Sequence, residues 1–431
     1  MPSQAKLPLK PISIKRIASV LMLIGFVAYS MNILLGSFFI GTPLQIWRQL
    51  MSALLLSMAL TIVLPRMKVD ISGMVFLVLT SAALLLSLYS LMRGFSLMRV
   101  GYAFFAYVGL SVFLLTNRIF EDEGKLDTLH KTLFFLLIVA SVGLLIDYFS
   151  DALQGIPRAE MSNDLEDLSL GHLRRASFLF GASTLVYPFL SFCFVAIIVY
   201  YRKLGAPRIG LLWLLVTLGL FVTLSRAAIV AWAILTIFLG IVWISQRMSI
   251  GRVFKIMVSI GLILFVATFL MPNISLQSDL AIERLSDPFS SEDNSNQVRI
   301  EYWLLGLKLF NFSPELIFGY GLGSTMGQIP DKMPVFTHYE SSFFQAMHEG
   351  GLFGLLIRYL PAVVAYWMFL KNKNARRRLD LKMYAAWLFV YLFVIFLAPT
   401  AGAFHNQLVY FYVCGLLIYR SQKYKHNINC A

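Results

Sequence analysis

The stretch Ile71-Ser-Gly-Met-Val-Phe-Leu-Val-Leu-Thr-Ser-Ala-Ala-Leu-Leu-Leu-Ser-Leu-Tyr-Ser-Leu91 decides the fold class of this chain, because it is apolar and contains no charged residue. An apolar helix of about 20 residues is long enough to cross the hydrocarbon core of a bilayer. Similar stretches recur along all 431 residues, of which 58% are hydrophobic and only 13% are charged. Soluble domains average about 25% charged residues. The sequence therefore predicts an all-α, polytopic membrane protein.

Twelve transmembrane helices are predicted from the apolar spans. The spans lie near residues 17–37, 49–65, 71–91, 99–117, 132–149, 176–200, 209–224, 227–245, 253–272, 350–370, 383–403 and 405–419. This pattern divides the chain into nine helices in residues 1–272, a long loop with amphipathic helices in 273–349, and three helices with a tail in 350–431. Only Ser225 and Arg226 separate the seventh and eighth spans, which predicts a tight hairpin or one broken helix.

The distribution of basic residues predicts how the chain is oriented. With the N-terminus inside, 24 of the 36 Lys and Arg residues lie on the inner side, 11 lie on the outer side, and Arg358 lies within a span. Inner loops of membrane proteins carry the excess of Lys and Arg. Both termini are therefore expected in the cytoplasm and the 273–349 loop outside. The same bias accounts for the net charge of +14 without a nucleic-acid partner.

The Arg residues on the outer side depart from this bias and are candidates for ligand binding: Arg174, Arg175, Arg226, Arg284 and Arg299. Arg226 is the most informative, because its neighbours in the sequence offer no acidic partner. An unpaired Arg at membrane depth costs about 2.5 kcal/mol or more. It either extends to lipid headgroups or binds an anionic ligand, since guanidinium donates two hydrogen bonds to phosphate. For Arg175, at the start of a span, the alternative role is that of an anchor at the membrane interface. For Arg299 the alternative is an ordinary solvated residue.

The segment Thr337-His-Tyr-Glu-Ser-Ser-Phe-Phe-Gln-Ala-Met-His-Glu-Gly-Gly351 concentrates titratable groups just ahead of the tenth span. We expect a helix from about residue 338, with His338, Ser341, Ser342 and Gln345 on one polar face. His338, with Glu340 beside it, is placed to act as a general base. His348 is interpreted as structural. The two His do not share a helical face well and no HExxH motif is present, so neither a metal nor a cofactor is expected.

Two further features bear on function. The turn Gly319-Tyr-Gly-Leu-Gly323 follows no predicted strand, so a tight loop is favoured over a phosphate-binding nest. The spans contain almost no carboxylates, and Asp147 comes closest, near the outer end of the fifth span. Ion-coupled transporters usually need intramembrane carboxylates. This absence disfavours a transporter.

Three segments give the chain a specific resemblance to the O-antigen ligase and O-antigen polymerase superfamily. Ser225-Arg226-Ala-Ala resembles the Ser-Arg-small signature of the family. Val298-Arg299, Ser313-Pro314 and Phe318-Gly-Tyr-Gly-Leu-Gly323 resemble the Arg, short helix and Gly turn of its periplasmic loop. His338 followed by Glu349-Gly-Gly-Leu-Phe-Gly354 resembles its His and Glu-x-Gly-x-x-Gly motif, and Arg175 weakly resembles an upstream Arg motif.

The resemblance implies a bacterial inner-membrane glycosyltransferase with a periplasmic active site. Its donor would be an undecaprenyl-diphosphate-linked glycan and its acceptor a glycolipid. Arg226, Arg299 and Arg175 would bind the diphosphate, while His338 and Glu340 would act on the acceptor hydroxyl. Ligases of the family usually have Asn after the His, whereas this chain has Tyr339-Glu340. That departure favours a polymerase that joins glycan repeats over a ligase that transfers the glycan to lipid A-core. The alternative that is not an enzyme is a flippase for lipid-linked glycan.

Overall fold

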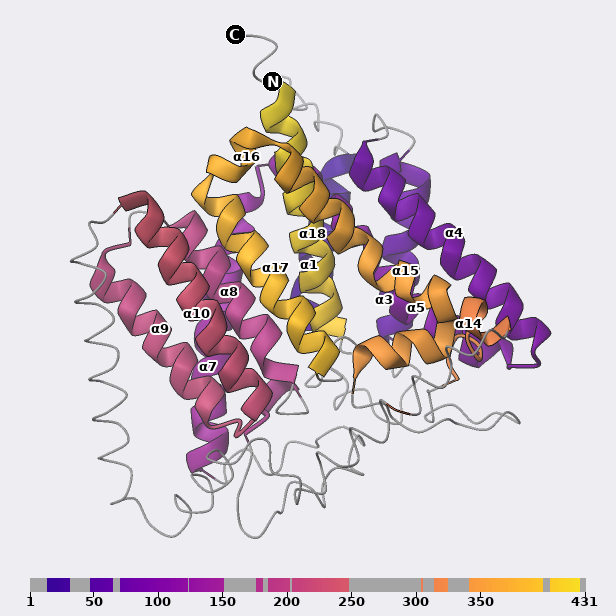
Figure 1. The fold of residues 1–431 in the computed structure, drawn as a ribbon, viewed down its shortest axis with the longest axis horizontal. Helices are drawn as coiled ribbons and strands as arrows, with labels where there is room; N and C mark the ends of the chain where they lie inside the picture. The colour runs from indigo at the N-terminus through magenta and orange to yellow at the C-terminus, as the bar shows by residue number, and fades with distance from the viewer. Residues whose placement is uncertain are drawn as a thin grey trace, which may run out of the picture.

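The computed structural model describes residues 14–31, 47–64, 70–122, 124–150, 176–180, 185–201, 204–247, 304, 314–324, 341–397 and 404–426. Every regular element in these ranges is a helix (Figure 1). The α-helices are α1 (Ile14–Ser30), α3 (Trp47–Met58), α4 (Ile71–Met92), α5 (Leu97–Val108), α6 (Thr116–Asp122), α7 (Leu126–Phe149), α8 (Val186–Tyr200), α9 (Ala206–Phe221), α10 (Arg226–Arg247), α14 (Pro314–Phe318), α15 (Ser342–Lys371), α16 (Lys373–Arg377), α17 (Leu379–Leu397) and α18 (Phe404–His426). A π-helical turn (Ala59–Val63) and two 3₁₀ helices (Gly109–Leu115 and Phe178–Phe180) complete the described elements.

The helical fold class predicted from the sequence is confirmed for the described residues. Four helices are long and apolar enough to cross a membrane: Ile71–Met92, Leu97–Glu121, Leu126–Phe149 and Ser342–Lys371. Shorter apolar helical segments are Arg16–Ser30 in α1, Val186–Tyr200 in α8, Ala206–Phe221 in α9 and Ala227–Trp243 in α10. The predicted ninth span at 253–272 and most of the predicted loop at 273–349 lie outside the described residues. A total of twelve spans therefore stays a prediction.

Two helices, α8 and α18, form the centre of the bundle. Every residue of α18 from 406 to 418 is buried, and so is every residue of α8 from 186 to 197. A helix that is apolar all round belongs in such a position. Gly415 lets α18 approach closely, because a Cβ there would lie 2.2 Å from the carbonyl oxygen of Leu114. Asn117 crosses the same contact by donating to the carbonyl oxygen of Tyr412 at 3.1 Å.

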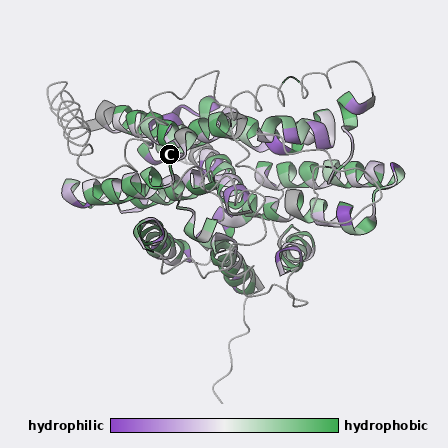
Figure 2. Ribbon diagram, turned by 90° about the horizontal axis from the view of Figure 1, so that it is seen from below, coloured by the Kyte–Doolittle hydropathy of each residue, from purple (hydrophilic) through white to green (hydrophobic). Residues whose placement is uncertain are grey.

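The outward faces of the peripheral helices are apolar, and α4 is the clearest example. Met74, Leu77, Val78, Leu84, Leu85 and Leu88 are all exposed on this helix. Apolar residues dominate the helices in Figure 2 as well. Large apolar patches on a soluble protein would be a liability, whereas lipid acyl chains solvate them. Asp70 starts α4, since its side chain accepts a hydrogen bond from the Gly73 amide.

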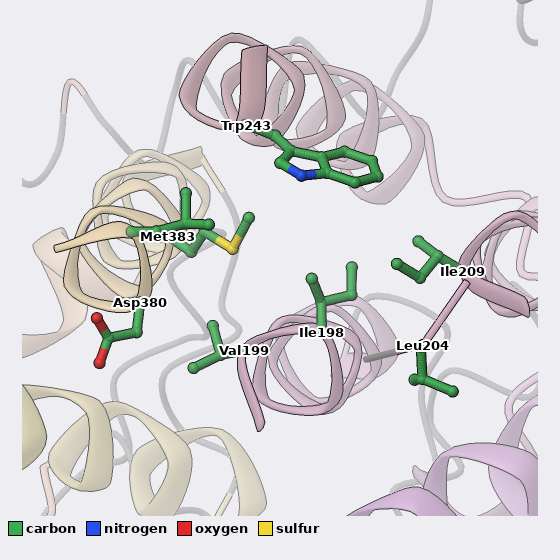
Figure 3. Close-up of a pocket in the computed structure, with 8 residues that line it drawn as sticks. Ile198, Val199, Leu204, Ile209, Trp243, Asp380 and Met383 are labelled. Carbon is green, nitrogen blue, oxygen red and sulfur yellow. The ribbon is translucent and has the colours of Figure 1, made fainter. Parts of the chain in front are cut away.

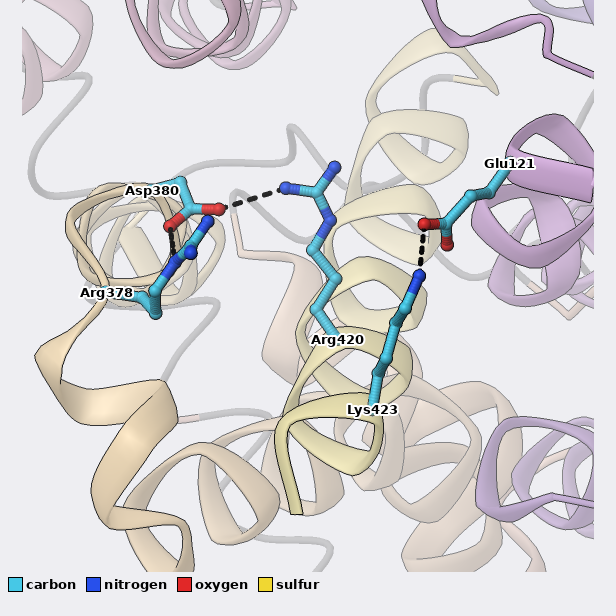
Figure 4. A network of polar contacts seen from close by, with 5 residues as sticks. All are labelled: Glu121, Arg378, Asp380, Arg420 and Lys423. Carbon is cyan, nitrogen blue, oxygen red and sulfur yellow. Dashed lines mark hydrogen bonds and ion pairs between the residues drawn. The ribbon is translucent and has the colours of Figure 1, made fainter. Parts of the chain in front are cut away.

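The two ends of the bundle differ in their polar groups, and α14 and α16 mark these opposite ends in Figure 1. The α16 end contains a network of ion pairs (Figure 4). Asp380, which is 1% exposed, contacts Arg378 at 3.2 Å and Arg420 at 3.0 Å, and Lys423 contacts Glu121 at 2.6 Å. The connection between α9 and α10 lies at the other end, together with α14 and the start of α15. The segments that carry the predicted site residues border this second end.

Candidate active site

The α9–α10 connection, which precedes Arg226, is a tight hairpin, the first of the two alternatives that the sequence left open. Two hydrogen bonds fix the pairing of the helices: Trp213 Nε1 donates to Thr236 Oγ1 at 3.3 Å, and Trp232 Nε1 donates to Thr217 Oγ1 at 2.9 Å. Within each pair the two residues are equally far from the turn along the sequence, as two antiparallel helices require. Arg226 is the first residue of α10. It therefore stands where the unpaired amides and the helix dipole favour an anion.

The turn itself is buried and strained. Val222, Thr223, Leu224 and Ser225 are each at most 7% exposed. Thr223 Oγ1 donates to the Leu220 carbonyl at 2.6 Å and accepts from the Ser225 amide at 3.3 Å. Leu224 has a φ of 50°. Such a value is uncommon for a residue with a side chain, and strained backbone is found disproportionately at functional sites.

A second strained segment follows Arg175 directly and is bonded to this turn. The Ala176 amide donates to the Val222 carbonyl at 3.1 Å. Asp147 Oδ2 accepts from the amides of Ser177 and Phe178, both at 2.9 Å. Phe178 has a φ of 39°, and among the described residues only Phe178 and Leu224 have a positive φ without being glycine. The structure thus joins the segment that follows Arg175 to the turn that precedes Arg226.

The Gly319–Gly323 turn interlocks with the break in α15. The Tyr320 amide donates to the His348 carbonyl at 2.8 Å, and the Gly321 amide donates to the Glu349 carbonyl at 3.2 Å. Gly319 and Gly351 have φ values of 66° and 55°. A Cβ on Gly319 would lie 2.5 Å from the His348 carbonyl oxygen, and a Cβ on Gly351 would lie 2.5 Å from the Leu316 carbonyl oxygen. These amides bind protein carbonyls and so do not point to an anion nest. The tight loop favoured from the sequence is confirmed.

The end of α4 and the start of α5 hold this assembly in place. Arg93 Nη1 contacts Glu315 Oε1 at 3.2 Å, which ties α14 to α4. Desolvation lowers the pKa of Arg93, but hydrogen bonds to Glu315 and Tyr89 raise it above its usual value, so the pair stays ionised. Ser90 Oγ accepts from the Leu322 amide at 2.7 Å. Aromatic stacking of Phe318 on Tyr89 and on Phe353, at centroid distances of 5.0 Å and 5.3 Å, completes the contact.

Arg99 is a structural contributor that the sequence reasoning missed. Its side chain is fully buried, with Nε donating to the Gly323 carbonyl at 2.8 Å and Nη2 donating to the Ser324 carbonyl at 3.1 Å. The guanidinium carbon lies 5.2 Å from the centroid of the Phe95 ring. The signal was present, because Arg93 and Arg99 are outer cations by the same count that singled out Arg226.

The described residues place the predicted site residues unequally. For Arg226 the structure gives the backbone position only. Arg175, Arg299, His338 and Glu340 lie outside the described residues, as do Arg174 and Arg284, so their roles stay predictions. The predicted helix start at residue 338 is wrong, because Ser341 is extended, with φ −143° and ψ 127°, and α15 begins at Ser342.

The two other residues considered are buried. The His348 ring is 2% exposed and stacks on Tyr320 at a centroid distance of 4.6 Å, which is a packing role. Arg358 is 5% exposed and so lies inside the bundle and does not extend along its lipid-facing surface. Tyr410 Oη donates to the Arg358 carbonyl at 2.6 Å.

A small pocket lies at the opposite end and is separate from these assemblies (Figure 3). Its volume is about 60 Å³, and apolar side chains such as Trp243, Met383 and Ile209 surround it. The only charged lining residue, Asp380, is held by Arg378 and Arg420. A pocket of this size, with its carboxylate already paired, has no place for a lipid-linked glycan.

The four long apolar helices indicate a helical membrane protein, and one known family matches a central part of the chain. Residues 209–359 match the family described as O-Antigen ligase. This match confirms the resemblance predicted from the sequence, and it supports a membrane enzyme of the ligase or polymerase type. Arg226, Arg299, His338 and Glu340 fall within the matched region, whereas Arg175 precedes it. The search of curated proteins found no match.

Proposed function

We propose that this chain is a membrane glycosyltransferase that polymerises undecaprenyl-diphosphate-linked oligosaccharide repeats at the periplasmic face of the bacterial inner membrane. The observation that carries this proposal is the O-antigen ligase match over residues 209–359, which contains four of the five predicted site residues. The distribution of Lys and Arg supports the orientation, since the segments with the site residues lie opposite the basic loops.

The geometry of the described residues supports a shared site in two ways. The hydrogen bond from Ala176 to Val222 brings the segments before Arg226 and after Arg175 together. The interlocked Gly turn fixes the start of α15, and His338 and Glu340 precede Ser341 by only three residues and one residue. Both assemblies lie at the same end of the bundle (Figure 1). A lipid-linked diphosphate, with its tail in the bilayer, would arrive at this end.

In the proposed reaction an acceptor sugar hydroxyl attacks the anomeric carbon of the donor glycan. The bond from that carbon to the diphosphate oxygen breaks, a glycosidic bond forms, and polyprenyl diphosphate leaves. Arg226, Arg299 and Arg175 would stabilise the negative charge that grows on the leaving group, an electrostatic contribution. His338 would accept the hydroxyl proton, with Glu340 beside it to orient or assist. Diphosphate is a good leaving group, so the scheme assigns no part to a metal or a cofactor.

Ligation of the finished glycan to lipid A-core is the second candidate, favoured by the description of the matched family. Tyr339-Glu340, in place of the Asn usual in ligases, favours the polymerase. Both reactions use the same donor chemistry and differ only in the acceptor. The residues proposed to bind the diphosphate are therefore the same in both.

The test compares Arg226→Ala, Arg299→Ala and His338→Ala with a matched Arg208→Ala control, by the length of the glycan on gels. Arg208 is exposed near the start of α9, at the opposite end of the hairpin from Arg226. We expect loss of chain extension in the three site variants, with single repeats still reaching the core, and a normal ladder in the control.

Other results separate the alternatives. Loss of all core-attached glycan would identify a ligase. Accumulation of lipid-linked repeats on the cytoplasmic side of the membrane would identify a flippase. Wild-type ladders from all three site variants would overturn the site assignment.

A further inference from the structure

The connection between α15 and α17 carries a concentrated positive charge. Residues 371–378, here called the basic turn, contain Lys371, Lys373, Arg376, Arg377 and Arg378 and no acidic residue. Arg378 is bound to the first carboxylate that follows, Asp380, at 3.2 Å. Lys371, Lys373, Arg376 and Arg377 are all exposed. The turn thus presents four cations to its surroundings.

Several other basic residues at this end of the bundle are paired with carboxylates. Arg420, Lys423, Arg118 and Lys131 each lie within 4 Å of a carboxylate oxygen. Within the described part of the chain, no carboxylate forms an ion pair with Lys371, Lys373 or Arg376. Three cations without an ion-paired carboxylate among the described residues therefore lie together on one short segment.

The turn is also held rigidly, so the charges are preorganised. Asn372 caps α16, because its Oδ1 accepts from the amides of Asn374 at 3.0 Å and Ala375 at 3.3 Å. Its Nδ2 donates to the Ser421 carbonyl on α18 at 2.6 Å. Ala375 is fully buried against the bundle. On this short helix Lys373 and Arg376 are exposed. A rigid array loses less entropy on binding than mobile side chains do.

The position of the turn relative to the membrane is indicated by α15. This candidate span ends at Lys371. Trp367, one helical turn earlier, is 52% exposed, and Lys371 Nζ lies 4.7 Å from the centroid of its ring. Trp residues concentrate at the level of lipid headgroups. The cations of the basic turn follow immediately and so fall at the height of the lipid phosphates.

We propose that the basic turn is a binding site for the headgroup of an anionic phospholipid. The phosphate would contact Lys373 and Arg376, with Lys371 and Trp367 beside the glycerol and the start of the acyl chains. Clusters of four or more Lys and Arg next to a membrane helix attract anionic lipids in this way. Since Asn372 and Ala375 tie the turn to α17 and α18, a bound lipid would stabilise the contact among α15, α17 and α18. This site is at the opposite end from the proposed active site and does not depend on the proposed function.

The test measures the melting temperature of the purified protein in detergent containing phosphatidylglycerol or phosphatidylcholine. The variant Lys373→Gln/Arg376→Gln is compared with Lys125→Gln/Arg208→Gln, which removes the same charge from the same end of the bundle. We expect phosphatidylglycerol to raise the melting temperature of the wild type and of the control by several degrees more than phosphatidylcholine does. The basic-turn variant should lose most of this difference. Native mass spectrometry should show fewer retained phosphatidylglycerol molecules on it.

Three results would overturn the proposal. The first is equal stabilisation of the wild type by both lipids. The second is an unchanged preference for phosphatidylglycerol in the basic-turn variant, or an equal loss in the control. The third is equal stabilisation by soluble glycerol 3-phosphate, which would identify a free phosphate as the ligand. If the double variant is not recovered folded, Arg376→Gln alone provides the same comparison.

Discussion

Gly351 is the residue on which the geometry of the candidate site depends most directly. Its torsion angles, φ 55° and ψ −138°, break α15 just after the predicted site stretch. A Cβ there would lie 2.5 Å from the Leu316 carbonyl oxygen. Gly350 and Gly351 stand at the start of the predicted tenth span, and the break falls at Gly351. Hydrophobic periodicity alone gives no such break, because the residues on both sides are helical.

Substitution Gly351→Ala should destabilise the protein by about 1–3 kcal/mol, the typical cost of an unfavourable backbone conformation. The clash with α14 should also shorten the glycan chains, because it displaces the segment that follows His338 and Glu340. Thermal unfolding in detergent and glycan gels measure the two effects. The control is Gly210→Ala on α9, where no atom lies within 4 Å of the new Cβ. A Gly351→Ala protein as stable as this control would contradict the interpretation.

Single residues also show where sequence reasoning ended. Arg226 was identified as important because it is a cation between two apolar spans, and that argument needs no structure. Arg99 was overlooked because a charge at the edge of an apolar span usually reaches to water. The structure shows that its partners are the carbonyls of Gly323 and Ser324, which are more than 220 residues away in the sequence. Backbone acceptors of this kind leave no pattern in the side chains.

At the scale of elements, the apolar spans predicted most of the helices but not their boundaries. The described helices correspond to eleven of the twelve predicted spans. Differences arise where helices continue beyond the apolar part: α15 begins at Ser342, although the apolar span begins near 350. The α9–α10 hairpin was predictable because its signal is local. The contact of the Gly319–Gly323 turn with Glu349 was not, since it joins two motifs through their backbones.

Asp147 shows how one side chain couples two elements of the candidate site. It is 1% exposed and accepts from the Ser177 and Phe178 amides, which directly follow Ala176, the residue bonded to the α9–α10 turn. Asp147→Ala should lower the free energy of unfolding by about 1–3 kcal/mol for each buried amide left without a partner. It should also reduce glycan polymerisation, because the segment after Arg175 loses its anchor.

The matched control for Asp147→Ala is Asp127→Ala, near the start of the same helix. The Asp127 side chain is 50% exposed and pairs with Lys131. Exposed ion pairs of this kind contribute little to the free energy of unfolding. Unfolding temperature and glycan length should therefore change little in the control. Equal effects of both substitutions would show that α7 itself, and not the Asp147 anchor, is responsible.

At the scale of the whole molecule, Asp380 connects the first turn of α17 to Arg420, near the end of α18. Asp380→Ala would leave Arg378 and Arg420 without their carboxylate. Breaking a fully buried pair costs about 3–5 kcal/mol. The Arg378 and Arg420 side chains are 42% and 26% exposed and keep access to water. We therefore expect Asp380→Ala to lower the free energy of unfolding by about 1–3 kcal/mol.

Chemical or thermal unfolding checks this prediction, with Glu121→Ala as the control. Glu121 and its partner Lys423 are 35% and 48% exposed, and such a pair contributes about 0.2–1 kcal/mol. Because the Asp380 network lies at the end opposite the candidate active site, the glycan produced by the remaining folded protein should have normal length. Shortened chains at normal protein abundance would contradict this separation.

The buried position of α8 has a consequence for the order of synthesis. Trp387 on α17 donates to Ser191 of α8 at 2.9 Å, across 196 residues of sequence. Asn406 on α18 donates to the carbonyl of Leu185 at 3.3 Å, across 221 residues. During translation α8 therefore enters the bilayer long before α17 and α18, which cover part of it. A nascent chain that stops before residue 379 would leave the Ser191 hydroxyl facing lipid, and such chains should be substrates for membrane proteases.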